Sequence, residues 1–261
     1  MLRSLKDLEG NTVNATDGDI GSVEDFLLDD EQWTIRYLVV DTVEFLDGRQ
    51  VLISPISFRQ AEWSTHRFHL ALTMADIENC PSTEMDKPVS RQHEQDFNQY
   101  YGYPPYWGDS GVWGLGDSPA VLAAKREEVA AARAAVHTEE RSYDAHLRST
   151  NELRGYHIQG TDEAIGHIED FIVDDETWEV RYLVIDTSNW WFGKRVLIAP
   201  RWASRISWEK KIVYVEMSRD SIKNSPELDP GLVINREYET HLYAYFGRPA
   251  YWTREDRSKS S

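Results

Sequence analysis

The stretch of sequence that decides the fold occupies residues 20–42 and reads IGSVEDFLLDDEQWTIRYLVVDT. A second version of it lies 145 residues further along, at residues 165–187, and reads IGHIEDFIVDDETWEVRYLVIDT. The two stretches share 15 identities over 23 positions. Self-similarity of this density at a fixed offset indicates an internal duplication, because chance seldom aligns so many residues without a gap.

The same offset holds outside these stretches. VLI at 51–53 corresponds to VLI at 196–198, and YW at 106–107 corresponds to YW at 251–252. We therefore predict two tandem copies of one domain on either side of a linker. The predicted boundaries are 1–107 for the first copy, 108–147 for the linker, 148–252 for the second copy and 253–261 for a flexible tail.

Short apolar segments separated by turn residues predict about six strands in each copy. In the first copy they fall at 11–15, 20–28, 33–41, 51–54, 56–63 and 68–72. A set of short strands buries a core and limits exposed edges best as a small barrel. The predicted fold class is therefore mainly β with accessory helices, arranged as two tandem small β-barrels. The predicted core positions are Tyr37/Tyr182, Val39/Val184, Leu52/Leu197 and Ile53/Ile198.

The last third of each copy changes its periodicity. Residues 90–101 and 235–246 place large apolar side chains four residues apart, which predicts an amphipathic helix. Gly102 and Gly247 are expected to end these helices. The aromatic segments that follow, 103–107 and 248–252, are expected to pack against their own barrels.

The linker begins with a glycine-rich part and continues as a helical part. Ser118 and Pro119 resemble an N-cap followed by proline at the first helical position. Residues 120–147 are rich in Ala, Glu and Arg, with one apolar residue per heptad. A solvated connecting helix is expected, since a coiled coil needs two apolar positions per heptad.

Charge and composition restrict the classes of partner. The net charge is −17, and residues 1–107 contribute 8 basic and 19 acidic side chains to it. Direct nucleic-acid binding is not expected, because it normally needs a basic surface. Cys80 is the single cysteine, so the chain has no cysteine cage for a metal, and a cytoplasmic location is expected. No stretch is apolar enough to predict a membrane span, while peripheral membrane association stays open.

The carboxylates are the main candidates for chemistry. The clusters 29–31 and 174–176 fit hairpin turns better than cation sites, because the glycine turn of a calcium loop is missing. Glu24 and Asp25 are adjacent on a strand and so face opposite sides, which excludes a joint acid–base pair. A structural salt link from the Glu24/Asp25 and Glu169/Asp170 pairs to Arg36 and Arg181 is expected instead. The histidines show no ligand spacing, and no nucleophile or phosphate-loop motif occurs. We predict no catalytic, cofactor-binding or metal-binding residues and no enzyme activity.

The loops at 43–48 and 188–193 differ most between the copies, yet both carry bulky apolar residues. Aromatic side chains supply much of the energy at protein interfaces. These loops are therefore the candidate interface, either with a protein partner or between the two copies. The candidate residues are Phe45, Leu46, Trp190, Trp191 and Phe192.

The repeated motif, from IGxVED or IGxIED through WxIRYLVVDT or WxVRYLVIDT to VLIxP, resembles the PRC-barrel family. That family includes the cytoplasmic domain of the photosynthetic reaction-centre H subunit and the C-terminal domain of a ribosome-maturation factor. The resemblance implies a bacterial, non-enzymatic protein that binds a partner, associates with itself or helps a complex to assemble. One alternative is a peripheral factor of a photosynthetic or other membrane electron-transfer complex. A metal-dependent hydrolase is a further alternative.

Overall fold

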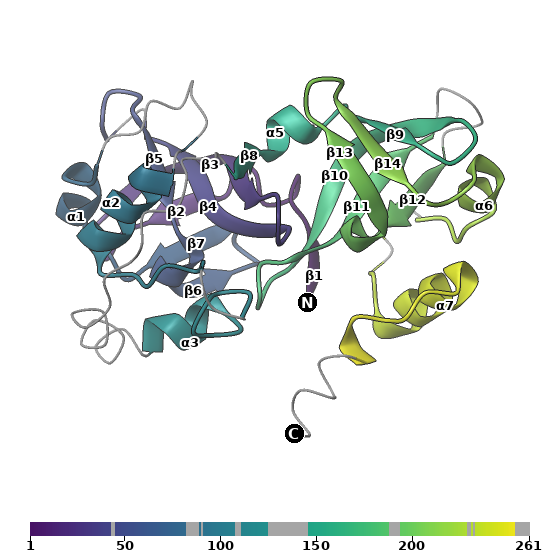
Figure 1. Cartoon of the computed structure of the whole chain (residues 1–261). Coiled ribbons are helices and arrows are strands. Elements are labelled where there is room, and N and C mark those ends of the chain that lie inside the picture. The colour runs from purple at the N-terminus through teal and green to yellow at the C-terminus, as the bar shows by residue number, and fades with distance from the viewer. Residues whose placement is uncertain are drawn as a thin grey trace. The chain divides into compact units, whose positions relative to one another are not determined.

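The protein is mainly β. The computed structural model describes residues 1–42, 45–81, 89, 91–107, 111–124, 146–187, 194–228, 231 and 233–253. These residues form two seven-stranded sheets and six α-helices (Figure 1). The chain divides into two compact units, and the division does not follow the repeats. Unit 1 contains Met1, Arg3–Leu153 and Val173–Val180, and unit 2 contains Leu2, Arg154–Ile172 and Arg181–Ser261.

The sheet of unit 1 is built mostly from the first repeat. Its strands run in the order β5-β4-β3-β2-β7-β6, and β8 adds to it by pairing with β3. All of these pairings are antiparallel except the parallel pairing of β2 with β7. The strands are β2 (Thr12–Asn14), β3 (Asp19–Asp29), β4 (Thr34–Asp41), β5 (Gln50–Ile53), β6 (Phe58–Glu62), β7 (Arg67–Leu70) and β8 (Leu147–Ser149).

The sheet built on the second repeat has the same topology. Its order is β12-β11-β10-β9-β14-β13, with β1 pairing to β10. Most strand bounds fall 145 residues after those of the first repeat, so the duplication in sequence is also a duplication in topology. The strands are β1 (Leu2–Ser4), β9 (His157–Gln159), β10 (Ala164–Asp174), β11 (Val180–Asp186), β12 (Arg195–Ile198), β13 (Ala203–Ser207) and β14 (Ile212–Val215).

The expected closure of each sheet into a barrel is not seen. Among the described strands each sheet is an open path, with β5 and β6 at the two ends of one and β12 and β13 at the two ends of the other. The chain between these end strands bends through a 3₁₀ helix, η1 (Pro55–Ser57) or η2 (Pro200–Trp202). The sequence predicted one strand over 56–63, whereas β6 begins only at Phe58. The reason is Pro55, which has no N–H for a strand ladder and occupies the first turn of η1.

Two equivalent glycines allow the central strands to approach closely. A Cβ on Gly21 would lie 1.8 Å from the carbonyl oxygen of Asp41, and one on Gly166 would lie 2.1 Å from that of Asp186. Gly21 also has a φ of 151°, which L side chains rarely adopt. The repeated Ile-Gly of the motif is therefore required where the first long strand crosses the end of the next.

The core prediction is confirmed at every position. Tyr37, Val39, Leu52 and Ile53 are all at most 3% exposed, and so are their counterparts in the second repeat: Tyr182, Val184, Leu197 and Ile198. In β4 all seven residues from Thr34 to Val40 are buried, in agreement with the expectation that this strand is covered on both faces.

The helices agree with the predicted ones and add several short ones. α2 (Arg91–Tyr101) and α7 (Arg236–Phe246) are followed by Gly102 and Gly247, whose φ values of 68° and 60° are left-handed. α3 (Pro119–Ala124) begins at the predicted proline. The linker residues 125–145 and the tail from 254 onward lie outside the described residues. The other helices are α1 (Met74–Glu78), α5 (Thr150–Leu153) and α6 (Arg219–Lys223).

Candidate functional site

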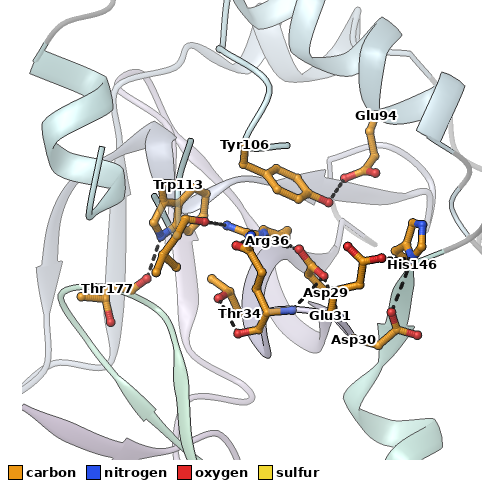
Figure 2. A network of polar contacts seen from close by, with 12 residues as sticks. Asp29, Asp30, Glu31, Thr34, Arg36, Glu94, Tyr106, Trp113, His146 and Thr177 are labelled. Atoms are coloured by element: carbon orange, nitrogen blue, oxygen red, sulfur yellow. Dashed lines mark hydrogen bonds and ion pairs between the residues drawn. The ribbon is translucent and has the colours of Figure 1, made fainter. Parts of the chain in front are cut away.

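The densest buried polar network of unit 1 is centred on Arg36 in β4 (Figure 2). This side chain is 1% exposed, and its guanidinium lies 3.0 Å from the carboxylate of Asp29. It also donates to the side-chain oxygen of Gln32 and to the carbonyl oxygen of Val112, each over 2.7 Å. A buried charge needs such partners, because losing its hydration without them is costly.

Aromatic rings enclose the same guanidinium. It lies 3.7 Å from the ring centroid of Tyr106 and 4.8 Å from that of Trp113. Trp113 is 1% exposed, and its indole N–H donates to the carbonyl oxygen of Thr177 over 2.7 Å. Arg36 thereby connects β4 to the aromatic residues after α2 and to the glycine-rich segment that follows them.

Glu94 of α2 forms the second centre of the network. Its carboxylate accepts a hydrogen bond from the Tyr106 hydroxyl over 2.6 Å and lies 3.0 Å from the guanidinium of Arg91. The Tyr37 hydroxyl of β4 also bonds to it. Glu94 is 2% exposed, and burial raises its pKa from the ordinary value of 4.5 to about 7, against the lowering by Arg91 and by the Tyr106 hydrogen bond. This carboxyl can therefore take up and release a proton near neutral pH.

Unit 2 repeats this arrangement on residues shifted by 145. Glu239 accepts hydrogen bonds from the hydroxyls of Tyr182 and Tyr251, over 2.7 Å and 2.9 Å. Arg236 lies 3.2 Å from the Glu239 carboxylate. The guanidinium of Arg181 lies 4.1 Å from the ring centroid of Tyr251. In both repeats one glutamate thus joins the C-terminal helix, the aromatic segment and the second long strand.

A second set of polar contacts attaches β8 and α5 to β3. The Asp25 carboxylate accepts from the backbone N–H of Phe26, the hydroxyl of Thr150 and the backbone N–H of Asn151, over 2.7, 2.8 and 3.1 Å. The Ser149 hydroxyl also donates to it. A carboxylate at the start of α5 satisfies N–H groups that have no partner within the helix.

The turn after β3 holds the chain just before β8 (Figure 2). The Asp30 carboxylate lies 3.1 Å from Arg148 and 3.6 Å from the His146 ring, and the His146 carbonyl accepts from the Asp30 N–H over 3.0 Å. Burial raises the pKa of Asp30, against the lowering by Arg148. These contacts and those of Asp25 make residues 146–153 a part of unit 1, although they begin the second repeat in sequence.

The tip of the β10–β11 hairpin, Val173–Val180, is also part of unit 1. Trp178 is 3% exposed, and its ring centroid lies 5.4 Å from that of Phe58 and 6.3 Å from that of Phe68. The carbonyl oxygen of Trp178 accepts from the Ile35 N–H over 2.8 Å. The tip thus contributes both an aromatic side chain and backbone hydrogen bonds.

The predicted carboxylate roles are confirmed in part. Asp29 accepts from the N–H groups of Glu31 and Gln32, and Asp174 accepts from those of Glu176 and Thr177, as expected of turn residues. Glu24 is exposed while Asp25 is buried, so the two do face opposite sides.

The predicted salt link from Glu24 or Asp25 to Arg36 is wrong. Arg36 pairs with Asp29, because both side chains are buried on the same face of the β3–β4 hairpin. Asp25 bonds to residues 149–151 instead, and Glu24 bonds to Gln50. In the second repeat Glu169 pairs with Arg195, at 2.6 Å, and the guanidinium of Arg181 stacks on Tyr251.

The predicted interface loops are described only in part. Phe45 and Leu46 are half-buried, and their N–H groups donate to the Thr42 carbonyl oxygen over 2.9 Å and 2.8 Å. Trp190, Trp191 and Phe192 lie outside the described residues. Within the described part of the chain no three His, Cys, Asp or Glu side chains are grouped as metal ligands. Nor does that part contain a helix with the length and hydropathy of a membrane span.

Part of the chain matches a known protein family. Residues 146–222 match the PRC-barrel domain. The matched segment starts just before β8 and ends within α6, so it contains β9 to β14 of the second repeat and covers less than a third of the chain. The first repeat has the same strand order. No curated protein matches the chain.

Sequence reasoning missed the glutamate network, although a signal for it was present. A lone glutamate on an amphipathic helix normally predicts a solvated side chain. However, Arg91 and Glu94 recur unchanged at 236 and 239 in helices that otherwise differ widely, and Tyr106 recurs at 251 in the segment after the helix. Identity at those positions, compared with the divergence around them, indicates residues whose side chains contact one another.

Proposed function

We propose that the chain is a non-enzymatic scaffold that binds a protein partner, with both repeats acting as PRC-type domains. The PRC-barrel match at residues 146–222 supports a role in protein interaction or assembly. The observation that carries the proposal is the use of the buried charges in unit 1. Arg36 and Asp25 each bond to side chains or backbone groups that fix another segment of the chain. Charges used in this way fix geometry rather than present a reactive group to a substrate.

Each repeat has its own proposed contact surface, which is the loop at 43–48 in the first repeat and the loop at 188–193 in the second. Two backbone hydrogen bonds to Thr42 hold the first loop in a turn, and Phe45 and Leu46 are each left partly exposed there. The second loop carries Trp190, Trp191 and Phe192. Bulky apolar side chains on short loops between paired strands suit an anchor on a rigid frame, since little conformational entropy is lost on binding.

The test is affinity capture with the full chain as bait, from soluble and membrane fractions of the source cells separately. Two loop variants, Trp190→Ser with Trp191→Ser and Phe45→Ser with Leu46→Ser, are compared with the control Val233→Ser. Val233 is 65% exposed, so its replacement removes an apolar surface group elsewhere without disturbing a core. Circular dichroism checks that each variant folds.

We expect the wild type and Val233→Ser to recover the same partner, and at least one folded loop variant to lose most of it. A partner recovered from the membrane fraction alone would favour the peripheral membrane-complex alternative. If neither loop variant reduces the recovery of any captured protein, the proposed contact surfaces are wrong.

A further inference from the structure

One carboxyl group in unit 1 holds three separate segments together. Glu94 belongs to α2, the Tyr106 hydroxyl that bonds to it comes from residues 102–107, and the Tyr37 hydroxyl comes from β4. We call residues 102–107 the tail segment. The Tyr103 hydroxyl lies 2.7 Å from that of Ser57, which attaches the same segment to η1. The position of α2 and the tail segment on the sheet thus depends on Glu94.

The groups that face Glu94 compensate its charge only in part. From α2 it meets Arg91, from the tail segment Tyr106, from β4 Tyr37 and Arg36, and from β3 Asp29. Arg36 already donates to Asp29, Gln32 and the Val112 carbonyl. Arg91 is therefore the cation that pairs directly with Glu94, and Asp29 adds a like charge. Ionisation here places a second carboxylate in a nearly water-free cluster, which is unfavourable.

We propose that Glu94 is a proton-controlled latch: a protonated carboxyl holds α2 and the tail segment closed on β4, and ionisation loosens them. The closed state buries the carboxyl, whereas in an opened state water would solvate it and restore its ordinary acidity. Closing therefore takes up a proton, and rising pH shifts the equilibrium toward opening. This inference concerns the chain alone and does not depend on a partner.

The size of the effect follows from proton linkage. The pKa of Glu94 is about 7 in the closed state, against an ordinary 4.5. Between pH 6.0 and 8.5 the opening equilibrium of α2 should rise about ten-fold, because the proton that favours closure is lost over this range. Above pH 8.5 the effect saturates.

The test is hydrogen exchange followed by mass spectrometry on the full chain at pH 6.0 and 8.5, corrected for the intrinsic pH dependence of exchange. We expect the opening of α2 to rise about ten-fold in the wild type and to stay constant in Glu94→Gln, whose amide mimics the neutral acid. The matched control is Glu239→Gln, which removes the equivalent carboxylate from unit 2 and should leave the ten-fold change at α2 intact.

Two outcomes would overturn the proposal. One is corrected protection of wild-type α2 that is the same at both pH values, and the other is a ten-fold rise that persists in Glu94→Gln. If Glu94→Gln does not fold, the wild type still decides the matter through carbon-13 NMR of its glutamate carboxyls. A carboxyl titrating near pH 7 supports the latch, and titration of every glutamate below pH 6 refutes it.

Discussion

Replacing Trp178 with alanine should destabilise unit 1, although Trp178 belongs to the second repeat in sequence. Its ring packs with Phe58 of β6 and Phe68 of β7, and it is 3% exposed. Trp178 also has a φ of 60°, a left-handed conformation that alanine tolerates no better than tryptophan. The change therefore removes the ring without relieving the backbone.

The size of the loss can be worked from the buried area. A buried tryptophan removes about 150–250 Å² from water, and each Å² contributes about 25 cal/mol. The nearly perpendicular contact with Phe58, with an interplanar angle of 72°, adds about 0.5–1.5 kcal/mol. Because alanine keeps only the Cβ, we expect the free energy of unfolding to fall by about 3–5 kcal/mol. The change Trp33→Ala, at the equivalent but only half-buried position, should cost less.

The assay is urea unfolding combined with hydrogen exchange resolved to peptides. Trp178→Ala should lower the protection of β6 and β7, which belong to unit 1, at urea concentrations where the wild type is still protected. If β6 and β7 keep their protection and only peptides of unit 2 lose it, the hairpin tip is not part of the core of unit 1. A decrease in the free energy of unfolding of less than about 1 kcal/mol would also contradict the argument that Trp178 is packed in a core.

The remaining predictions concern the core, the cap and the buried glutamate. Leu197→Ala, at a fully buried position, should lower the free energy of unfolding, measured by urea unfolding, by about 2–4 kcal/mol. A loss under about 0.5 kcal/mol would contradict the burial of this side chain. Asp25→Ala should cost about 2–3 kcal/mol, because several hydrogen bonds to a charged group are lost, while Ser149→Ala should cost less in the same assay. The pKa of Glu94 is raised in the folded state, so the stability that its protonated form contributes is fully present below about pH 4.5 and is lost as the pH rises through 7. Between pH 5 and 8 the unfolding free energy of the wild type should therefore fall by about 2–3 kcal/mol more than that of Glu94→Gln. If the two proteins show the same dependence of unfolding free energy on pH, Glu94 does not contribute in this way.

The strands were predictable because each has a strong local signal. Phe68, Leu70 and their neighbours alternate in polarity, and the acidic turn before Trp33 separates two apolar segments. The predicted positions of β3, β4, β5 and β7 differ from the observed ones by one or two residues at most ends. The helix ends were predictable for the same reason, since glycine is the residue that best adopts the left-handed cap.

The features that were missed depend on partners distant in sequence. Leu-Arg-Ser occurs at 2–4 and at 147–149, but three residues carry no periodicity from which a strand can be inferred. The partner of Arg36 was predicted wrongly because the alternation of side chains along a strand shows on which face a carboxylate lies. It does not show which cation pairs with that carboxylate. Barrel closure was inferred from strand number, whereas the hydrogen-bonded order along the described strands leaves β5 and β6 unpaired with each other.

The repeats in the sequence and the compact units in the structure therefore have different boundaries. The segment that matches the PRC-barrel domain begins at His146, yet residues 146–153 and 173–180 complete unit 1. The backbone bond from the Ile35 N–H to Trp178 and the hydrogen bonds from residues 149–151 to Asp25 join the two repeats in sequence but lie within unit 1. A substitution at Trp178 or Thr150 should therefore act first on the unit into which the side chain packs, and not on the repeat in which it is encoded.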